Sequence, residues 1–174
     1  MNALSTKKTY ITQGERAVSN DPNEAITTIL GSCVSCCLWD PIAKVGGMNH
    51  MLLAVSTKSD GICNLAGINA MELLINDLLK LGGSRSRLHA KAFGGARMVA
   101  GLSDVGQKNI NFTLEFLEKE DIFCETHSLG GDHARHIMFW PTSGRVMQKV
   151  RKDEIVEEKV AAPPVDAGNG LELF

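Results

Sequence analysis

The chain has 174 residues, of which 44% are apolar and 22% charged, and its formal net charge is −2. This composition is typical of one globular domain and excludes wholesale disorder and fibrous repeats. A domain that grips phosphate backbones is normally clearly basic, so nucleic acid is not expected as a partner. No uncharged apolar run is long enough to span a membrane, and the N-terminus carries no apolar signal segment. The sequence therefore predicts a cytoplasmic protein that is not membrane-spanning.

The cysteines support the same compartment. There are five, an odd number, and three of them crowd together at Cys33, Cys36 and Cys37. Such close neighbours make a poor disulfide framework, whereas reduced thiols are normal in the cytoplasm. A reduced cysteine can act as a nucleophile or as a metal ligand, and the surrounding residues must decide between the two.

Strand and helix patterns alternate along the chain. Runs rich in β-branched residues or with alternating polarity predict strands, and apolar residues at three- and four-residue spacing predict helices. The expected strands, in chain order, cover residues 9–13, 25–30, 34–39, 48–53, 88–93, 122–126, 135–140 and 145–150. The expected helices run from Leu65 to the Gly82-Gly83 pair and over residues 107–119.

The order of these elements predicts an α+β fold, because adjacent strands joined by short turns pair antiparallel. We expect a sandwich of largely antiparallel strands with two main helices. The predicted organisation is a flexible N-terminus over residues 1–8, one domain over 9–150, and a charged segment with a disordered tail over 151–174.

The residues between Thr27 and Leu53 carry the most chemical information. Gly31 and Ser32 interrupt a strand just before Cys33, and His50 lies on the next returning strand. A cysteine at such a turn can project its sulfur past the sheet edge, where backbone N–H groups can stabilise an oxyanion. A nearby imidazole lowers the pKa of a thiol and handles its proton. The spacing permits a Cys-His pair, but a cysteine in an apolar strand is also often an inert core residue.

A metal or redox role is a second interpretation of the cysteines. Cys33 and Cys36 form a CxxC motif, and His133 with His136 would complete a nominal zinc set. Redox motifs of this kind usually open a helix, whereas residues 34–39 are expected to form a strand. Strand alternation would also turn Cys36 away from the side on which Cys33 lies.

Several motifs closely resemble the CheD family of chemoreceptor glutamine deamidases, over roughly residues 9–150. The matching segments are Thr27–Pro41 (TTILGSCVSCCLWDP), Gly46–Leu53 (GGMNHMLL), Met71–Asn76 (MELLIN), Lys91–Met98 (KAFGGARM) and Gly130–Arg135 (GGDHAR). The combination is highly specific.

The resemblance implies a layered sandwich fold and a cysteine hydrolase that needs no metal or organic cofactor. It assigns the catalytic roles to Cys33, His50 and Thr27. The neighbouring Thr28 is also a hydroxyl, and alternation lets only one of the two threonines reach His50. The implied activity is that of a protein-glutamine glutaminase. Glutamines in the cytoplasmic domains of chemoreceptors, the methyl-accepting chemotaxis proteins, become glutamates through a cysteine thioester.

Further residues are candidates for oxyanion or substrate binding. They are Ser32, Gly94, Gly95, Gly130, Gly131 and Arg135. For the glycine pairs, turn geometry alone is an equally good interpretation. The alternative function that the resemblance allows is a regulatory binding module for a CheC-type phosphatase, which would not depend on the Cys33 thiol.

Overall fold

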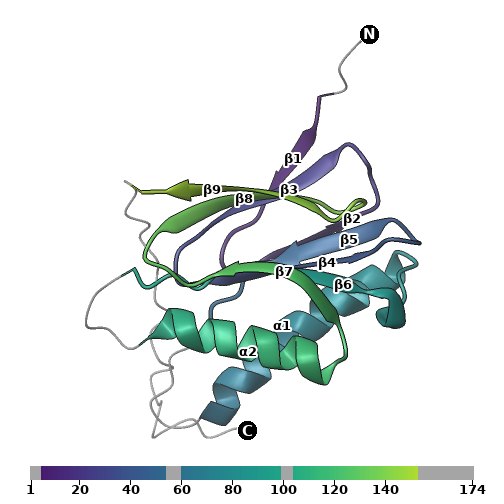
Figure 1. Ribbon diagram of the computed structural model, residues 1–174. Coiled ribbons are helices and arrows are strands. Elements are labelled where there is room, and N and C mark those ends of the chain that lie inside the picture. The colour runs from purple at the N-terminus through teal and green to yellow at the C-terminus, as the bar shows by residue number, and fades with distance from the viewer. Residues whose placement is uncertain (1–4, 54–59, 99–103, 153–174) are drawn as a thin grey trace, which may run out of the picture.

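The computed structural model describes residues 5–53, 60–98 and 104–152. Figure 1 shows three layers: a four-stranded sheet, a five-stranded sheet and a pair of helices. The five-stranded sheet is the middle layer, since the other sheet covers one of its faces and the helices cover the other. This arrangement confirms the expected α+β class.

The four-stranded sheet has the order β1-β3-β8-β9. Its strands are β1 (Lys7–Tyr10), β3 (Glu24–Leu30), β8 (Ala134–Trp140) and β9 (Arg145–Arg151). β8 and β9 form the expected antiparallel hairpin, and β3 pairs antiparallel with β8, but β1 runs parallel to β3. Alternate residues of β3 and β8 therefore face the middle sheet.

The five-stranded sheet has the order β2-β5-β4-β6-β7. Its strands are β2 (Arg16–Ser19), β5 (Val45–Asn49), β4 (Val34–Asp40), β6 (His89–Gly94) and β7 (Phe123–Leu129). β6 and β7 are parallel, and the other neighbours are antiparallel. Every residue of the central strand β4 is buried, because both of its faces are covered.

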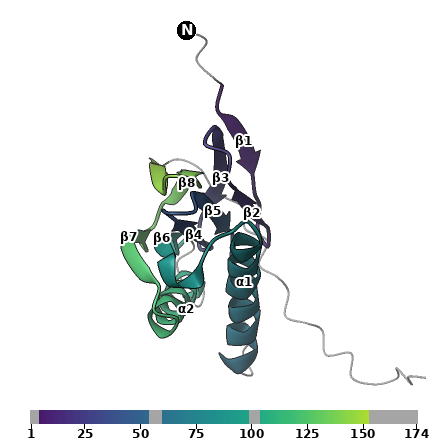
Figure 2. The same cartoon turned by 90° about the vertical axis from the view of Figure 1, so that its right-hand side faces the viewer.

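Two long helices cover the outer face of the five-stranded sheet, as Figures 1 and 2 show. They are α1 (Asp60–Lys80) and α2 (Val105–Lys119). Helix α1 is followed by Gly82, whose φ of 98° suits the expected glycine stop. Helix α2 begins at an Asp104 cap, whose carboxylate accepts a 3.0 Å hydrogen bond from the Gln107 backbone N–H. A short 3₁₀ turn (Arg85–Arg87) precedes β6.

Apolar side chains fill both gaps between the layers. The inter-sheet core lies between the two sheets and contains Ile26, Leu30, Cys33, Met48 and Ile137 among others. The helix-side core lies between the five-stranded sheet and the helices, and it contains residues of α1 and α2 together with Cys36.

Several predicted boundaries are wrong. The strand expected at residues 9–13 begins at Lys7 and ends at Tyr10, so Lys7 and Lys8 belong to a strand. The strand expected at 48–53 ends at Asn49, and the four-residue β2 was not predicted. A strand as short as β2 has too few residues for its alternation to stand out. Residues 1–4 and 153–174, which include most of the expected flexible ends, lie outside the described residues. Among the residues that are described, no helix could cross a membrane.

Candidate active site

His50 follows β5 and is 7% exposed. Its Nδ1 lies 2.8 Å from the Thr28 hydroxyl, and that hydroxyl donates a 2.7 Å hydrogen bond to the Ile11 carbonyl. A hydroxyl has only one hydrogen to donate, so Thr28 must accept from a proton on Nδ1. The imidazole is therefore held in the tautomer that leaves the lone pair of Nε2 available as a base.

The predicted contact between Thr27 and His50 is wrong, and Thr28 makes it instead. Thr27 points to the other face of β3, where its hydroxyl lies 2.6 Å from His136 Nε2 and donates to the Ile137 carbonyl. Thr28 shares its face with Ile26 and Leu30, both of the inter-sheet core. Alternation along the strand separates the two threonines, and the pairing of β3 with the rest of its sheet decides which of them faces inward.

Cys33 lies on the same face of the five-stranded sheet as His50. The next residue, Val34, pairs with Met51 through two backbone hydrogen bonds of 3.0 and 2.8 Å. In this antiparallel register Cys33 and His50 are diagonal neighbours, a relation that leaves about 7–8 Å between backbones and allows long side chains to meet. Cys33 is 1% exposed and packs in the inter-sheet core, toward which the His50 ring also points.

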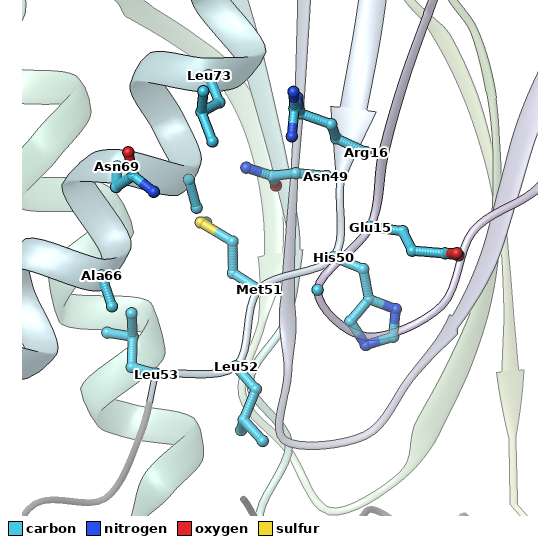
Figure 3. Close-up of a pocket in the computed structure, with 12 residues that line it drawn as sticks. Glu15, Arg16, Asn49, His50, Met51, Leu52, Leu53, Ala66, Asn69 and Leu73 are labelled. Atoms are coloured by element: carbon cyan, nitrogen blue, oxygen red, sulfur yellow. The ribbon is translucent and has the colours of Figure 1, made fainter. Parts of the chain in front are cut away.

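Figure 3 shows the residues around His50. Its ring points away from Asn49 and Met51, in keeping with strand alternation. Glu15 lies beside His50: the His50 N–H donates to the Glu15 carbonyl, and the N–H of the neighbouring Gly14 donates to the His50 carbonyl. A cavity of about 230 Å³ opens here. Its lining is Gly14, Glu15, Arg16, Asn49, His50, Met51, Leu52, Leu53, Ala66, Asn69, Ala70 and Leu73.

The backbone carbonyls of three successive residues, Gly31, Ser32 and Cys33, each accept a hydrogen bond. The Gly31 oxygen accepts from Ala96 N–H at 2.9 Å, and the Cys33 oxygen accepts from Gly95 N–H at 2.8 Å. Between them, the Ser32 oxygen accepts from the side-chain amide of Asn109 at 2.8 Å. Sequence reasoning missed Asn109. The signal that could have found it is its position on α2: it precedes Thr113 and Leu117 at four-residue spacing, which places a polar side chain on the buried face of the helix.

Of the four candidate glycines, Gly94 and Gly95 contact this backbone directly, whereas Gly130 and Gly131 bond to Gly94 and Arg97. Gly94 has a φ of 114°, and a Cβ placed on it would lie 2.1 Å from the Cys33 carbonyl oxygen. Gly130 N–H donates to the Gly94 carbonyl, and the Gly131 carbonyl accepts from Arg97 N–H, both at 2.8 Å. The Gly95 N–H also donates to the Cys33 carbonyl. Gly94 and Gly95 therefore allow the end of β6 to pack directly against the Cys33 turn.

Arg135 does not reach out toward a substrate. It is 6% exposed, and its guanidinium donates to the carbonyls of Ser128, Gly94 and Gly130. These carbonyls lie at or next to the ends of β6 and β7. The side chain therefore fastens two strand ends and the glycine turn together, which corrects the expectation of a substrate contact.

The CxxC interpretation fails on geometry. Cys33 belongs to the inter-sheet core and Cys36 to the helix-side core, so the sheet separates the two sulfurs. Such a pair cannot close a disulfide or share a metal ion. His136 lies against Thr27 on the outer side of the four-stranded sheet. Burial raises the pKa of the Cys36 and Cys37 thiols, which keeps both neutral.

Burial also lowers the pKa of His50 to about 4, and the nearby Glu15 carboxylate partly opposes this shift. Burial disfavours the charged imidazolium, whereas a negative charge nearby favours it. His50 is therefore neutral, and able to accept a proton, at any pH near 7.

The pH dependence follows from this shift. We expect activity that depends on His50 as a base to fall only when the pH drops through about 4, instead of near 6.5. Glu15→Gln removes the charge that favours the imidazolium, so its acid limb should move to still lower pH. The measurement is kcat/KM against pH for both proteins. An acid limb near 6.5 that Glu15→Gln leaves unmoved would contradict the role of these residues.

Protein stability needs a parallel measurement. The unfolded chain takes up this proton near pH 6.5 and the folded chain only near 4, so the free energy of unfolding declines as the pH falls between those values. Circular dichroism at each pH separates this loss of folded protein from the loss of the base.

The two threonines allow a matched test of the site. Thr28→Val removes the acceptor that orients His50, and we expect kcat to fall about 10- to 100-fold, the equivalent of one strong hydrogen bond. Thr27→Val is the control, because it removes a hydroxyl that is equally buried but bonds to His136 and Ile137. Its kcat should stay within about twofold of wild type. Equal losses in the two variants would contradict the assignment of Thr28.

Fold and site together define an α+β sandwich protein in which one face of a sheet carries both a thiol and a tautomerically fixed imidazole. Comparisons with known proteins bear on the family. The family model described as CheD chemotactic sensory transduction matches residues 55–150. A relative from Rhizobium leguminosarum bv. trifolii, named probable chemoreceptor glutamine deamidase CheD, is 45% identical over 100% of both chains. The chain belongs to the CheD family.

One further relative supports this result. A Cereibacter sphaeroides protein, also named probable chemoreceptor glutamine deamidase CheD, is 52% identical over 80% of this chain and 70% of its own length. Among solved structures, a Neisseria meningitidis protein of the DUF152 family model superposes with a TM-score of 0.49 at 10% identity. It covers 72% of this chain and 64% of its own.

Proposed function

We propose that the chain is a protein-glutamine deamidase that converts glutamine side chains of chemoreceptors to glutamate and releases ammonia. One observation carries the proposal: Thr28 holds His50 with Nε2 as the base, on the sheet face that also presents Cys33. The names of the CheD relatives supply the substrate class.

In the first half of the reaction, Cys33 Sγ attacks the carboxamide carbon of the glutamine. The thiol proton passes to His50 Nε2, and the carbonyl oxygen becomes an oxyanion. The backbone N–H groups of Ser32 and Cys33 are the proposed donors to that oxyanion. His50 then gives its proton to the departing nitrogen, the C–N bond breaks, and ammonia leaves a Cys33 thioester.

In the second half, water replaces ammonia. His50 Nε2 takes a proton from the water as its oxygen attacks the thioester carbon. The C–S bond breaks, the proton returns to Cys33, and the substrate side chain is now a carboxylic acid that ionises. The nucleophile and the base are both side chains of this chain, so the proposed reaction requires no metal or organic cofactor.

The product changes the charge of the receptor. A neutral amide becomes a carboxylate, and like charges between packed helices repel one another, which shifts the balance of signalling states. The substrates are the cytoplasmic domains of methyl-accepting chemotaxis proteins, so we propose that the chain acts in the cytoplasm, in the control of chemotaxis.

Mass spectrometry tests the proposal. The chain is incubated with a purified receptor cytoplasmic domain, and conversion of glutamine to glutamate is followed peptide by peptide. Prior treatment with iodoacetamide should stop the conversion. Cys124→Ser serves as the control, because it removes a partly exposed thiol distant in sequence from the site and should not change the rate.

Binding to a CheC-type phosphatase would survive alkylation, so a pull-down reports on that alternative separately. Unaltered receptor peptides would refute the deamidase proposal.

A further inference from the structure

Asn109 is a buried amide that joins α2 to the turn before the thiol. It is 1% exposed. Its Nδ2 donates to the Ser32 carbonyl at 2.8 Å, and its Oδ1 accepts from the Leu53 backbone N–H at 3.1 Å. A carbonyl can only accept and an N–H can only donate, so these partners fix the orientation of the amide. One side chain thus connects the turn that carries Cys33 to the segment that follows His50.

The hydrogen bond to Ser32 sets the direction of a neighbouring N–H. In a planar trans peptide the C=O and the N–H point in opposite directions. The Ser32 carbonyl points toward α2, which lies on the helix-side face of the five-stranded sheet (Figure 1). The N–H of Cys33 belongs to the same peptide and therefore points toward the inter-sheet side. The Cys33 side chain and the His50 ring lie on that side too.

Asn109 also differs from the donors on either side of it. Backbone N–H groups of Ala96 and Gly95 hold the carbonyls of Gly31 and Cys33, whereas a side chain holds that of Ser32. Of these three carbonyls, only that of Ser32 therefore loses its hydrogen-bond donor when a side chain is substituted. A hydrogen bond accepted by the carbonyl also polarises the peptide and strengthens its N–H as a donor.

We infer that Asn109 is a positioning residue for the reaction: by holding the Ser32 carbonyl, it aims the Cys33 N–H at the oxyanion of the tetrahedral intermediate. The inference rests on the proposed deamidation at Cys33. Asn109 itself touches no reacting atom and acts through the Ser32–Cys33 peptide.

Asn109→Asp is the test. One oxygen of the new carboxyl group can still accept from the Leu53 N–H. The other oxygen stands where the amide donated to the Ser32 carbonyl, and it can donate there only when the carboxyl is protonated. We expect kcat for deamidation at pH 8 to fall at least about tenfold, since removing one oxyanion donor costs about 10²–10³-fold. The ratio of the variant's kcat to that of wild type should rise as the pH is lowered and the carboxyl regains a proton.

A second readout separates positioning from damage to the fold. Alkylation of Cys33 by iodoacetamide forms no oxyanion, so its rate should stay within about twofold of wild type. Thr113→Val is the matched control. It removes another buried hydrogen bond of α2, from Thr113 Oγ1 to the Asn109 backbone carbonyl, and it leaves the Ser32 peptide alone. Its kcat should be close to that of wild type. If Asn109→Asp does not fold, Asn109→Ala removes the same donor without adding a charge and should show the same split between the two rates.

Two results would overturn the inference while leaving the proposed function intact. One is wild-type kcat in Asn109→Asp or Asn109→Ala, and the other is a parallel fall of deamidation and alkylation. A wild-type protein that alkylates at Cys33 but deamidates no receptor domain would overturn the proposed function, and the inference with it.

Discussion

Cys33→Ala is expected to abolish deamidation, lowering kcat by at least about 1,000-fold. Without the sulfur no thioester forms, and His50 has no nucleophile from which to take a proton. The fold should tolerate the change, because alanine removes one atom from a site in the inter-sheet core and leaves its backbone hydrogen bonds in place. The measurement is release of ammonia from a receptor cytoplasmic domain, with conversion of the glutamines followed by mass spectrometry.

Cys36→Ala is the control for this experiment. It is the same substitution three residues further on, but its sulfur lies in the helix-side core, and burial keeps that thiol neutral. We expect a modest loss of stability, about 1 kcal/mol, with kcat unchanged. Activity that survives loss of Cys33, or that is lost equally in both variants, would rule out Cys33 as the nucleophile.

Gly94→Ala should give the largest loss of stability of the substitutions considered. A φ of 114° disfavours any side chain, and the new Cβ would meet the Cys33 carbonyl oxygen at 2.1 Å. Backbone strain and overpacking each cost about 1–3 kcal/mol, so we expect the free energy of unfolding to fall by about 3 kcal/mol or more. Urea denaturation followed by circular dichroism measures the change.

Gly82→Ala separates the two causes. Gly82 also has a positive φ, 98°, but a Cβ there would meet nothing within 4 Å. Its cost should be that of the backbone conformation alone, about 1–2 kcal/mol. If Gly94→Ala proves no more destabilising than Gly82→Ala, the close contact between the end of β6 and the Cys33 turn is not a tight constraint.

The sequence predicted much of the local structure, because local structure follows from local pattern. The apolar spacing after Leu65 and the glycine pair at its end indicated α1, and a four-residue turn between two strand patterns indicated the β8–β9 hairpin. The glycine-serine break before Cys33 and the expected returning strand that carries His50 permitted a Cys-His pair, and the segments that resemble the CheD family then assigned it. Each of these inferences depends on residues close together along the chain.

Tertiary structure decided the rest, because a side chain's partners across a sheet or from a helix depend on register and packing, which no short segment encodes. Alternation showed that one threonine would face His50, but only the pairing of β3 with β8 turned Thr28 inward and Thr27 outward. The sequence made Arg135 a candidate substrate contact, whereas in the fold its guanidinium donates to backbone carbonyls of Gly94 and Gly130 and holds the strand ends together. Asn109 lies far along the chain from Ser32 and reaches its carbonyl only because α2 packs behind the Cys33 turn.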